Sequence, residues 1–127
     1  FDSSFSSVAG GIMIVDLEKV SIYVRPGKTD MRKQINGLSI LVQDELKLDP
    51  FSGALFLFCN KRRHLLKILY WDKTGFCMWI KRLERDKFPW PVNRTEVQEI
   101  DFERLRQLLS GIDFWEAHEE VKYSSVS

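Results

Sequence analysis

The sequence predicts an α+β fold, a compact antiparallel β-meander of three to four strands packed with two helices. In the middle of the chain, short apolar runs rich in β-branched and aromatic residues alternate with polar turns, which is typical of strands. Before and after this region, apolar residues recur at three- and four-residue steps, which is typical of helices with one buried face. At 127 residues, 44% of them hydrophobic, the chain has the size of one domain.

The first expected elements are a short strand and a helix. Residues 20–24 (VSIYV) are predicted to form the strand. A turn follows, because Pro26 fixes φ and Gly27 allows positive φ. Thr29 or Asp30 is expected to cap the helix. The apolar stripe of this helix comprises Met31, Ile35, Leu38, Leu41, Val42 and Leu46.

The central strands follow from three apolar runs. Residues 54–59 (ALFLFC) are almost continuously apolar, which indicates a central strand. Residues 65–71 (LLKILYW) are predicted to pair with them as an antiparallel hairpin, and residues 76–80 (FCMWI) to start the next strand. Residues 90–92 are expected at most as an edge segment, since Pro89 and Pro91 cannot donate to a ladder.

The second helix and the chain ends complete the prediction. Asp101 is expected to open the helix and Gly111 to stop it. Its apolar face comprises Phe102, Leu105, Leu108 and Leu109. Residues 1–12 are expected to be a disordered or vector-derived leader before a native start at Met13, residues 13–115 a single α+β domain, and residues 116–127 a flexible acidic tail.

A cytoplasmic protein is the simplest expectation. No apolar run approaches the ~20 residues that span a bilayer, and residues 1–11 lack the features of a signal peptide. Cys59 and Cys77 form neither a metal-binding spacing nor a disulfide framework. Both lie in apolar runs and are expected to be buried, reduced thiols, in keeping with the cytosol.

Charge is distributed unevenly along the chain. Residues 60–95 contain ten Lys or Arg and three Asp or Glu, a net charge of +7. Residues 1–59 carry −1 and residues 96–127 carry −5, although the whole chain carries only +1. A basic middle with interleaved aromatic residues is typical of a surface that meets polyanions. The alternative is a set of ordinary solvated strand faces.

The basic residues form two predicted clusters. Long side chains at the tip of the expected hairpin, at residues 60–64, are placed to reach phosphates. The predicted nucleic-acid-binding residues of this tip and the strand and turn after it are Lys61, Arg62, Arg63, His64, Lys67 and Lys73. The second cluster comprises Lys81, Arg82, Arg85 and Lys87. Trp90 is predicted to be exposed and to stack on unpaired bases, whereas most other aromatic residues are expected in the core.

Several motifs in order resemble the accessory, second-reading-frame proteins of the insertion sequence sixty-six family, which that family calls TnpB. The motifs are Thr29-Asp30-Met31-Arg32-Lys33, Asn36-Gly37-Leu38, Asp49-Pro50-Phe51-Ser52-Gly53, residues 60–72, Gly75-Phe76, Lys81-Arg82-Leu83-Glu84, Phe88 and Trp90-Pro91. The resemblance covers about residues 20–114. It implies a small accessory protein of transposition. In that family, the acidic catalytic triad belongs to a separate, larger transposase subunit. Arg32 and Lys33 lie in the first motif and join the predicted DNA contacts.

The residues themselves do not favour an enzyme. There is no Gly-rich phosphate loop, HExxH or CxxC motif, and neither His64 nor His118 has a nucleophile beside it in sequence. The acids that would hold catalytic metal ions have turn or capping roles instead, as with Asp49 and Asp101. We therefore expect no catalytic residues, no metal and no cofactor.

Two functions remain open, beside a cryptic nuclease that is kept only because the family context is DNA rearrangement. In the first, the protein binds DNA through the basic hairpin and assists the catalytic transposase subunit of the same element. In the second, it is an assembly adaptor without direct DNA contact, whose basic patch docks acidic segments of that subunit. No membrane partner is expected, and the sequence leaves the oligomeric state open.

Overall fold

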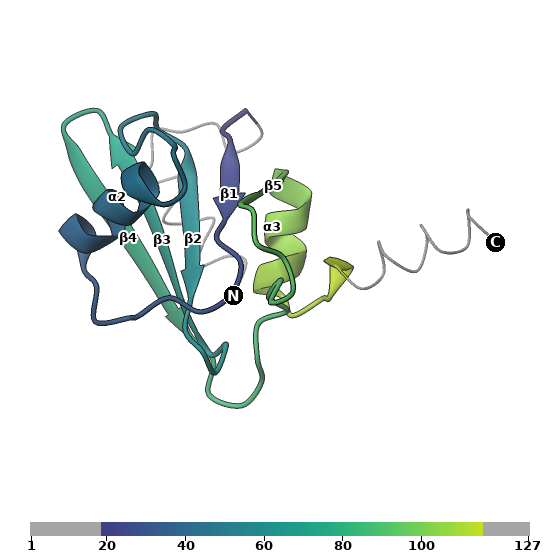
Figure 1. Cartoon of the computed structure of the whole chain (residues 1–127). Helices are drawn as coiled ribbons and strands as arrows, with labels where there is room; N and C mark the ends of the chain where they lie inside the picture. Colours follow the sequence, from purple (N-terminus) through teal and green to yellow (C-terminus); the bar gives the residue numbers. More distant parts are fainter. Residues whose placement is uncertain (1–18, 116–127) are drawn as a thin grey trace.

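The computed structural model describes residues 19–115 and confirms the α+β class, with a five-stranded sheet and two helices (Figure 1). The elements in chain order are β1 (Ile22–Val24), α2 (Ile35–Asp44), β2 (Leu55–Cys59), β3 (Leu65–Asp72), β4 (Gly75–Arg82), β5 (Gln98–Ile100) and α3 (Phe102–Leu109). The expected leader, the expected start at Met13 and the acidic tail lie outside the described residues.

The sheet is mixed rather than a pure meander. Its strand order is β4-β3-β2-β1-β5, and β1 pairs with β2 in parallel while the other three pairings are antiparallel. A parallel pair needs a crossover, and α2 with its flanking loops provides it. The fifth strand was not predicted, and residues 90–92, the expected edge segment, are irregular.

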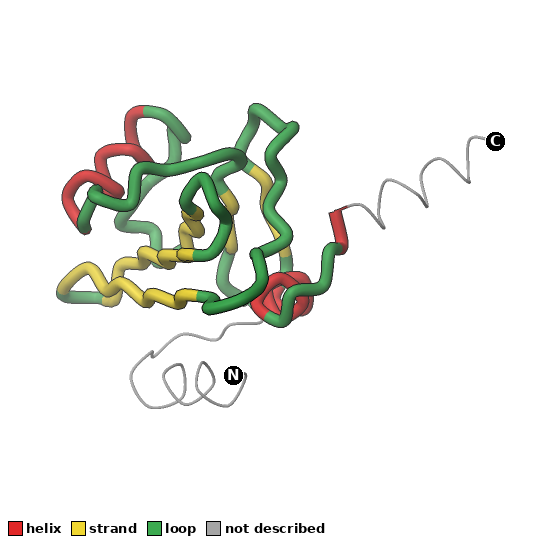
Figure 2. Tube along the Cα trace, turned by 90° about the horizontal axis from the view of Figure 1, so that it is seen from below, coloured by secondary structure: helices red, strands yellow, loops and turns green. Residues whose placement is uncertain are grey.

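The two helices cover opposite faces of the sheet, which gives three layers (Figures 1 and 2). α2 packs through Leu38, Leu41 and Val42 on the face that includes Phe56 and Phe58. On the other face, α3 and the loop after β4 pack against apolar side chains of β1, β2 and β3, which are Ile22, Val24, Leu55, Leu57, Leu66 and Ile68. β2 is buried on both faces, as its continuous apolar run predicts.

The start of α2 differs from the prediction. The helix begins at Ile35, and its N-cap residue, Gln34, makes no side-chain capping bond. Thr29 does not cap it, because its buried hydroxyl accepts a bond from Arg25 Nη1 at 2.9 Å. Asp30 does not cap it either, because its carboxylate binds Arg32.

The boundaries of α3 confirm the prediction. Asp101 is the N-cap, and its Oδ1 accepts a hydrogen bond from the backbone N–H of Arg104 at 2.8 Å. Gly111, two residues beyond the helix, adopts φ +84°, the left-handed conformation expected of a glycine that ends a helix.

The cysteines are both free, but only one is fully buried. Cys59 is 0% exposed in β2, and burial raises the pKa of its thiol to about 12. Cys77 in β4 is half-buried, which corrects the expectation that both lie in the core. Within residues 19–115, neither helix has the length and apolar character needed to cross a membrane.

Candidate nucleic-acid interface

Three loops meet at one end of the sheet. β1 runs parallel to β2, so the loop after β1 (residues 25–34) lies at the same end as the β2–β3 turn (residues 60–64). β4 also ends there, and residues 83–97 follow it (Figure 1, lower end). Loops 25–34 and 60–64 together contain seven Lys or Arg and one Asp. We call these two loops, with the bordering residues 82–88, the basic end.

Asn60 organises the β2–β3 turn. Its Oδ1 accepts hydrogen bonds from the backbone N–H groups of His64 and Leu65, at 3.0 and 3.1 Å. Its Nδ2 lies 3.0 Å from His64 Nδ1 and therefore donates to it. Arg63 adopts φ +61° within this turn, and the predicted contacts Lys61 and Arg62 are exposed at its tip. His64 is thus a structural member of the turn.

The segment after β4 lies against this turn. The backbone N–H of Leu83 donates to His64 O, and that of Phe88 donates to Arg63 O, both at 2.7 Å. These bonds bring residues 84–87 beside the hairpin tip. Arg85 and Lys87 are exposed in this segment, close in the fold to the turn that carries Lys61 and Arg62. Charges in this segment largely cancel, since Glu84 binds Arg82 at 2.8 Å and Asp86 separates the two cations.

The loop after β1 completes the basic end. The N–H of Thr29 donates to Cys59 O at 2.8 Å, which joins this loop to the end of β2. Arg32 and Lys33 are exposed beyond this anchor. Sequence reasoning missed Lys28, which is exposed in the same loop, although the turn sequence Arg25-Pro26-Gly27-Lys28 places it directly after a strand.

Arg32 is held by Asp30. Arg32 Nε lies 3.1 Å from both carboxylate oxygens of Asp30, and Nη2 lies 2.8 Å from Oδ2. The side-chain bond from Arg32 is the main reason that the pKa of Asp30 falls to about 2, and the backbone N–H of Arg32 adds to it. The guanidinium still projects into solvent, with 91% of its side chain exposed.

We expect the Asp30 carboxyl to titrate near pH 2 in the folded protein. A depressed folded-state pKa favours the folded state above the ordinary value of 3.8, and this contribution disappears as the pH falls through about 2. Carboxyl ¹³C NMR measures the midpoint directly. Arg32→Ala should raise it, whereas Arg62→Ala, in the neighbouring loop, should not. An unchanged midpoint in Arg32→Ala would show that the pair does not form in solution.

Lys67 was predicted to contact phosphate, but the structure places it in the interior. The residue is 4% exposed, and its Nζ donates to the backbone oxygens of Met31 and Lys33, at 2.9 and 3.0 Å. Burial lowers the pKa of its ammonium group. Lys67 therefore connects β3 to the loop that carries Arg32 and Lys33, and it helps to hold this loop of the basic end in place.

Lys67→Met should lower the free energy of unfolding by about 2 kcal/mol, because two bonds from a charged donor are lost and two carbonyls are left without it. Chemical unfolding followed by circular dichroism measures this change. Lys61→Met is the matched control, since Lys61 is exposed, and its stability should stay within about 0.5 kcal/mol of the parent. Equal free energies of unfolding for Lys67→Met and the parent would show that the two hydrogen bonds of Lys67 do not stabilise the protein.

Trp90 is also buried, contrary to the prediction of an exposed stacking residue. It is 4% exposed, and its Nε1 donates to Arg25 O at 2.9 Å. The neighbouring Pro91 O accepts from the N–H of Gly27 at 3.0 Å. Residues 90 and 91 therefore fasten the loop after β4 to the end of β1, which keeps the three loops together.

Two other predicted contacts lie away from the basic end. Lys73 is in the β3–β4 turn at the opposite end of the sheet, with φ +50°. Lys81 is half-buried in β4, opposite Leu66 and hence on the face that α3 covers. The structure therefore brings together eight of the thirteen predicted residues as solvent-accessible cations: Arg32, Lys33, Lys61, Arg62, Arg63, Arg82, Arg85 and Lys87.

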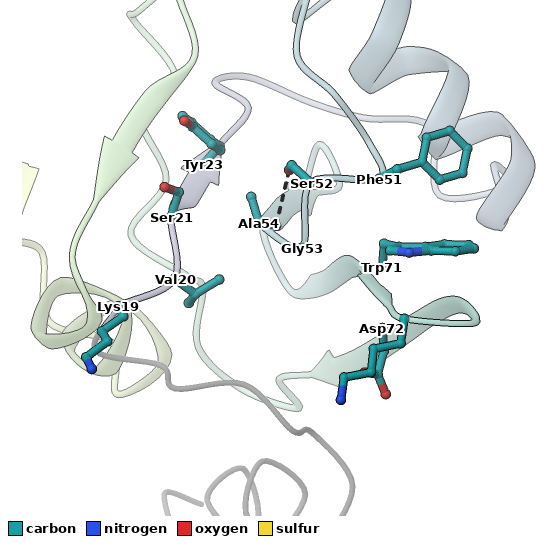
Figure 3. A pocket seen from close by; sticks show the side chains of 11 residues that line it. Lys19, Val20, Ser21, Tyr23, Phe51, Ser52, Gly53, Ala54, Trp71 and Asp72 are labelled. Atoms are coloured by element: carbon teal, nitrogen blue, oxygen red, sulfur yellow. Dashed lines mark hydrogen bonds between the residues drawn. The ribbon is translucent and has the colours of Figure 1, made fainter.

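An open hollow of about 630 Å³ lies at the opposite end of the sheet (Figure 3). Val20, Ser21 and Tyr23 line one side, and Trp71 and Asp72 line the other. Phe51 is 55% exposed and packs edge-on against Trp71, with ring centroids 5.1 Å apart. The hollow thus has an aromatic wall far from the basic end. Within residues 19–115, no group of three or more His, Cys, Asp or Glu is arranged to hold a metal ion.

Comparisons with known proteins agree with the sequence resemblance. A family model described as IS66 Orf2 like protein matches residues 20–119. Two proteins of Sinorhizobium fredii (strain NBRC 101917 / NGR234) align over 102 residues, 80% of this chain. "Uncharacterized protein y4hO" is 38% identical over 89% of its length, and "Uncharacterized protein y4jC" is 33% identical over 87% of its length. No solved structure matches the chain significantly.

Proposed function

The chain belongs to the IS66 Orf2 like protein family, which implies an accessory role in transposition, and from this premise we propose that it is a non-catalytic DNA-binding subunit that works beside a separate catalytic transposase. The basic end is the proposed DNA surface. The observation that carries the proposal is the meeting of loops 25–34 and 60–64, with seven cations and one acid, at one end of the sheet.

The arrangement suits the phosphate backbone more than base edges. The eight accessible cations stand on turns, on loops and at the end of β4, and neither α2 nor α3 carries one of them, so neither helix is supported as a recognition helix. Each Lys or Arg that neutralises a phosphate releases condensed counterions, which favours binding at low salt. Contacts of this kind position a protein on DNA without selecting a sequence. We therefore propose that any preference for element ends arises from DNA shape or from the catalytic subunit.

The direct test is fluorescence anisotropy of the full chain with labelled DNA over a salt series. The probes are a duplex with the element's terminal repeats, a scrambled duplex and a single strand. We expect binding to both duplexes, with an affinity that falls steeply as salt rises. Absence of binding to every probe at low salt would refute the proposal.

A second candidate is the adaptor without DNA contact, and one observation favours it. The aromatic wall of Phe51 and Trp71 leaves an apolar surface at the end opposite the basic end. Such surfaces are common in protein–protein contacts. Co-purification with the catalytic subunit that survives nuclease and high salt, together with no DNA binding in the anisotropy series, would establish the adaptor instead.

A further inference from the structure

A second hollow, of about 320 Å³, opens beside the basic end. Arg63 lines it from the β2–β3 turn. Asn93 and Arg94 line it from the loop after β4, and Asp113 and Trp115 line it from the segment after α3. The hollow has the size of a small ligand site, and through Arg63 it is continuous with the proposed DNA surface.

Backbone hydrogen bonds on both sides hold Arg63 in place. Its N–H donates to Asn60 O within the turn at 3.0 Å, and its own carbonyl accepts from the N–H of Phe88 at 2.7 Å. Arg63 therefore stands where the turn meets the loop after β4. A guanidinium group in such a fixed position is suited to bind a phosphate through two parallel hydrogen bonds.

Arg94 and Trp115 form a stacked pair in the lining of the hollow. The guanidinium carbon of Arg94 lies over the indole of Trp115, 5.4 Å from the ring centroid. Trp115 Nε1 donates to Pro89 O at 2.8 Å, and Arg94 has a further interaction within the protein, so neither side chain is free. Nucleobases stack on planar guanidinium groups and on aromatic rings, so this pair offers a surface for a base.

The other groups of the hollow suit a base better than a second phosphate. Asn93 provides an amide, with two donors and an acceptor. Asp113 has an interaction within the protein, but a carboxylate has about four acceptor sites, so it can also accept from the amino group of a base. The same carboxylate would repel a second anion. Val92, 52% exposed, adds apolar surface.

We propose that this hollow binds one unpaired nucleotide of a DNA molecule whose duplex lies on the basic end. The phosphate of this nucleotide binds Arg63, and its base stacks on Arg94 and Trp115. A paired base is enclosed in the duplex, so the nucleotide comes from a single-stranded overhang or a frayed end. The inference rests on the proposed function and adds to it a preference for a DNA structure, not for a sequence.

Fluorescence anisotropy with two labelled duplexes tests the role of the base. Both carry a single-stranded overhang of the same length, but in one the overhang consists of abasic nucleotides. Because the number of phosphates is the same, a difference in affinity reports the bases alone. We expect the overhang with bases to bind about tenfold more tightly, as stacking of one base provides. Equal affinities would overturn the inference and leave the proposed function intact, whereas binding of neither probe would refute both.

Arg94→Ala should reduce this ratio of affinities to about one. Arg104→Ala is the matched control, because Arg104 is also half-buried and lies over an aromatic ring, that of Phe114, at 5.6 Å, but does not line this hollow. The control should keep the tenfold ratio. Circular dichroism checks that both variants are folded. A ratio that Arg94→Ala retains, or that both variants lose equally, would overturn the inference.

Binding of thymidine 5′-monophosphate, followed by NMR, tests the hollow without any variant. We expect saturable shifts of the indole N–H signal of Trp115 and the side-chain amide signals of Asn93. Inorganic phosphate and thymidine, each added alone at the same concentration, should shift these signals less. If inorganic phosphate reproduces the full shifts, the hollow is a phosphate site only and the assignment of a nucleotide is wrong.

Discussion

Replacing Lys33, Lys61 and Arg62 together with alanine should weaken DNA binding by about 10²–10³-fold at 0.1 M salt. The three side chains are exposed on the two loops that form the basic end. Each phosphate contact contributes about 0.9 to the slope of log affinity against log salt, so the slope should fall by about 2.7. The anisotropy series with duplex DNA measures both quantities, and the change in slope distinguishes lost phosphate contacts from a general loss of folded protein.

The control removes the same charge elsewhere. Lys19, Lys47 and Lys73 lie outside the basic end, and Lys73 marks the opposite end of the sheet. Their triple alanine variant has the same net charge as the first variant, so long-range attraction is reduced equally. We expect this control to keep most of the affinity and nearly the full salt slope. If both variants lose binding equally, the protein responds only to net charge and the basic end is not a defined surface.

Trp90→Ala should lower the free energy of unfolding by about 3–5 kcal/mol. The side chain is 4% exposed in the core under α3, and its indole N–H is bonded to Arg25 O. The alanine variant leaves a cavity and an unpaired carbonyl. Trp90→Phe keeps much of the ring and should lose about 1 kcal/mol for the hydrogen bond, in addition to a smaller packing loss. Urea unfolding followed by circular dichroism measures both.

Phe51→Ala provides the comparison for Trp90, because Phe51 is an aromatic residue that is 55% exposed. Phe51→Ala should lower the free energy of unfolding by less than Trp90→Ala does, because the Phe51 side chain buries less apolar surface in the folded protein. If Trp90→Ala unfolds at the same urea concentration as the parent, Trp90 is a surface residue in solution. The original stacking prediction would then be restored.

Local patterns predicted the parts of the fold that local interactions determine. The continuous apolar run of β2 and the Asp101 cap of α3 are properties of neighbouring residues, and both are confirmed. The parallel pairing of β1 with β2 was not predictable, because nothing in either strand marks its partner. The helix start was placed too early because Met31 continues the apolar stripe. Met31 packs against the apolar cluster under α2, but it lies in the loop before the helix. The apolar stripe therefore indicated correctly that Met31 is partly buried, but not that it is helical.

The candidate site shows the same limit. The basic turn at residues 60–64 was identified because it is continuous in sequence. Its neighbour, loop 25–34, enters the site only because β1 is parallel to β2. Lys67 and Trp90 were placed on the surface because charge and aromatic character do not distinguish an exposed side chain from a buried one with hydrogen-bond partners. Only the fold shows that carbonyls of residues 25, 31 and 33 lie within their reach.

The strand order also determines the sequence of events in folding. The β2–β3 and β3–β4 pairings join segments that are adjacent in the chain, so their loop-closure cost is small. The β1–β5 pairing joins Ile22 to Ile100 and closes most of the domain. Non-local pairings of this kind form slowly. We therefore expect β2, β3 and β4 to assemble first, and β1 to be enclosed only after β5 has left the ribosome, so that loop 25–34 takes its place at the basic end last.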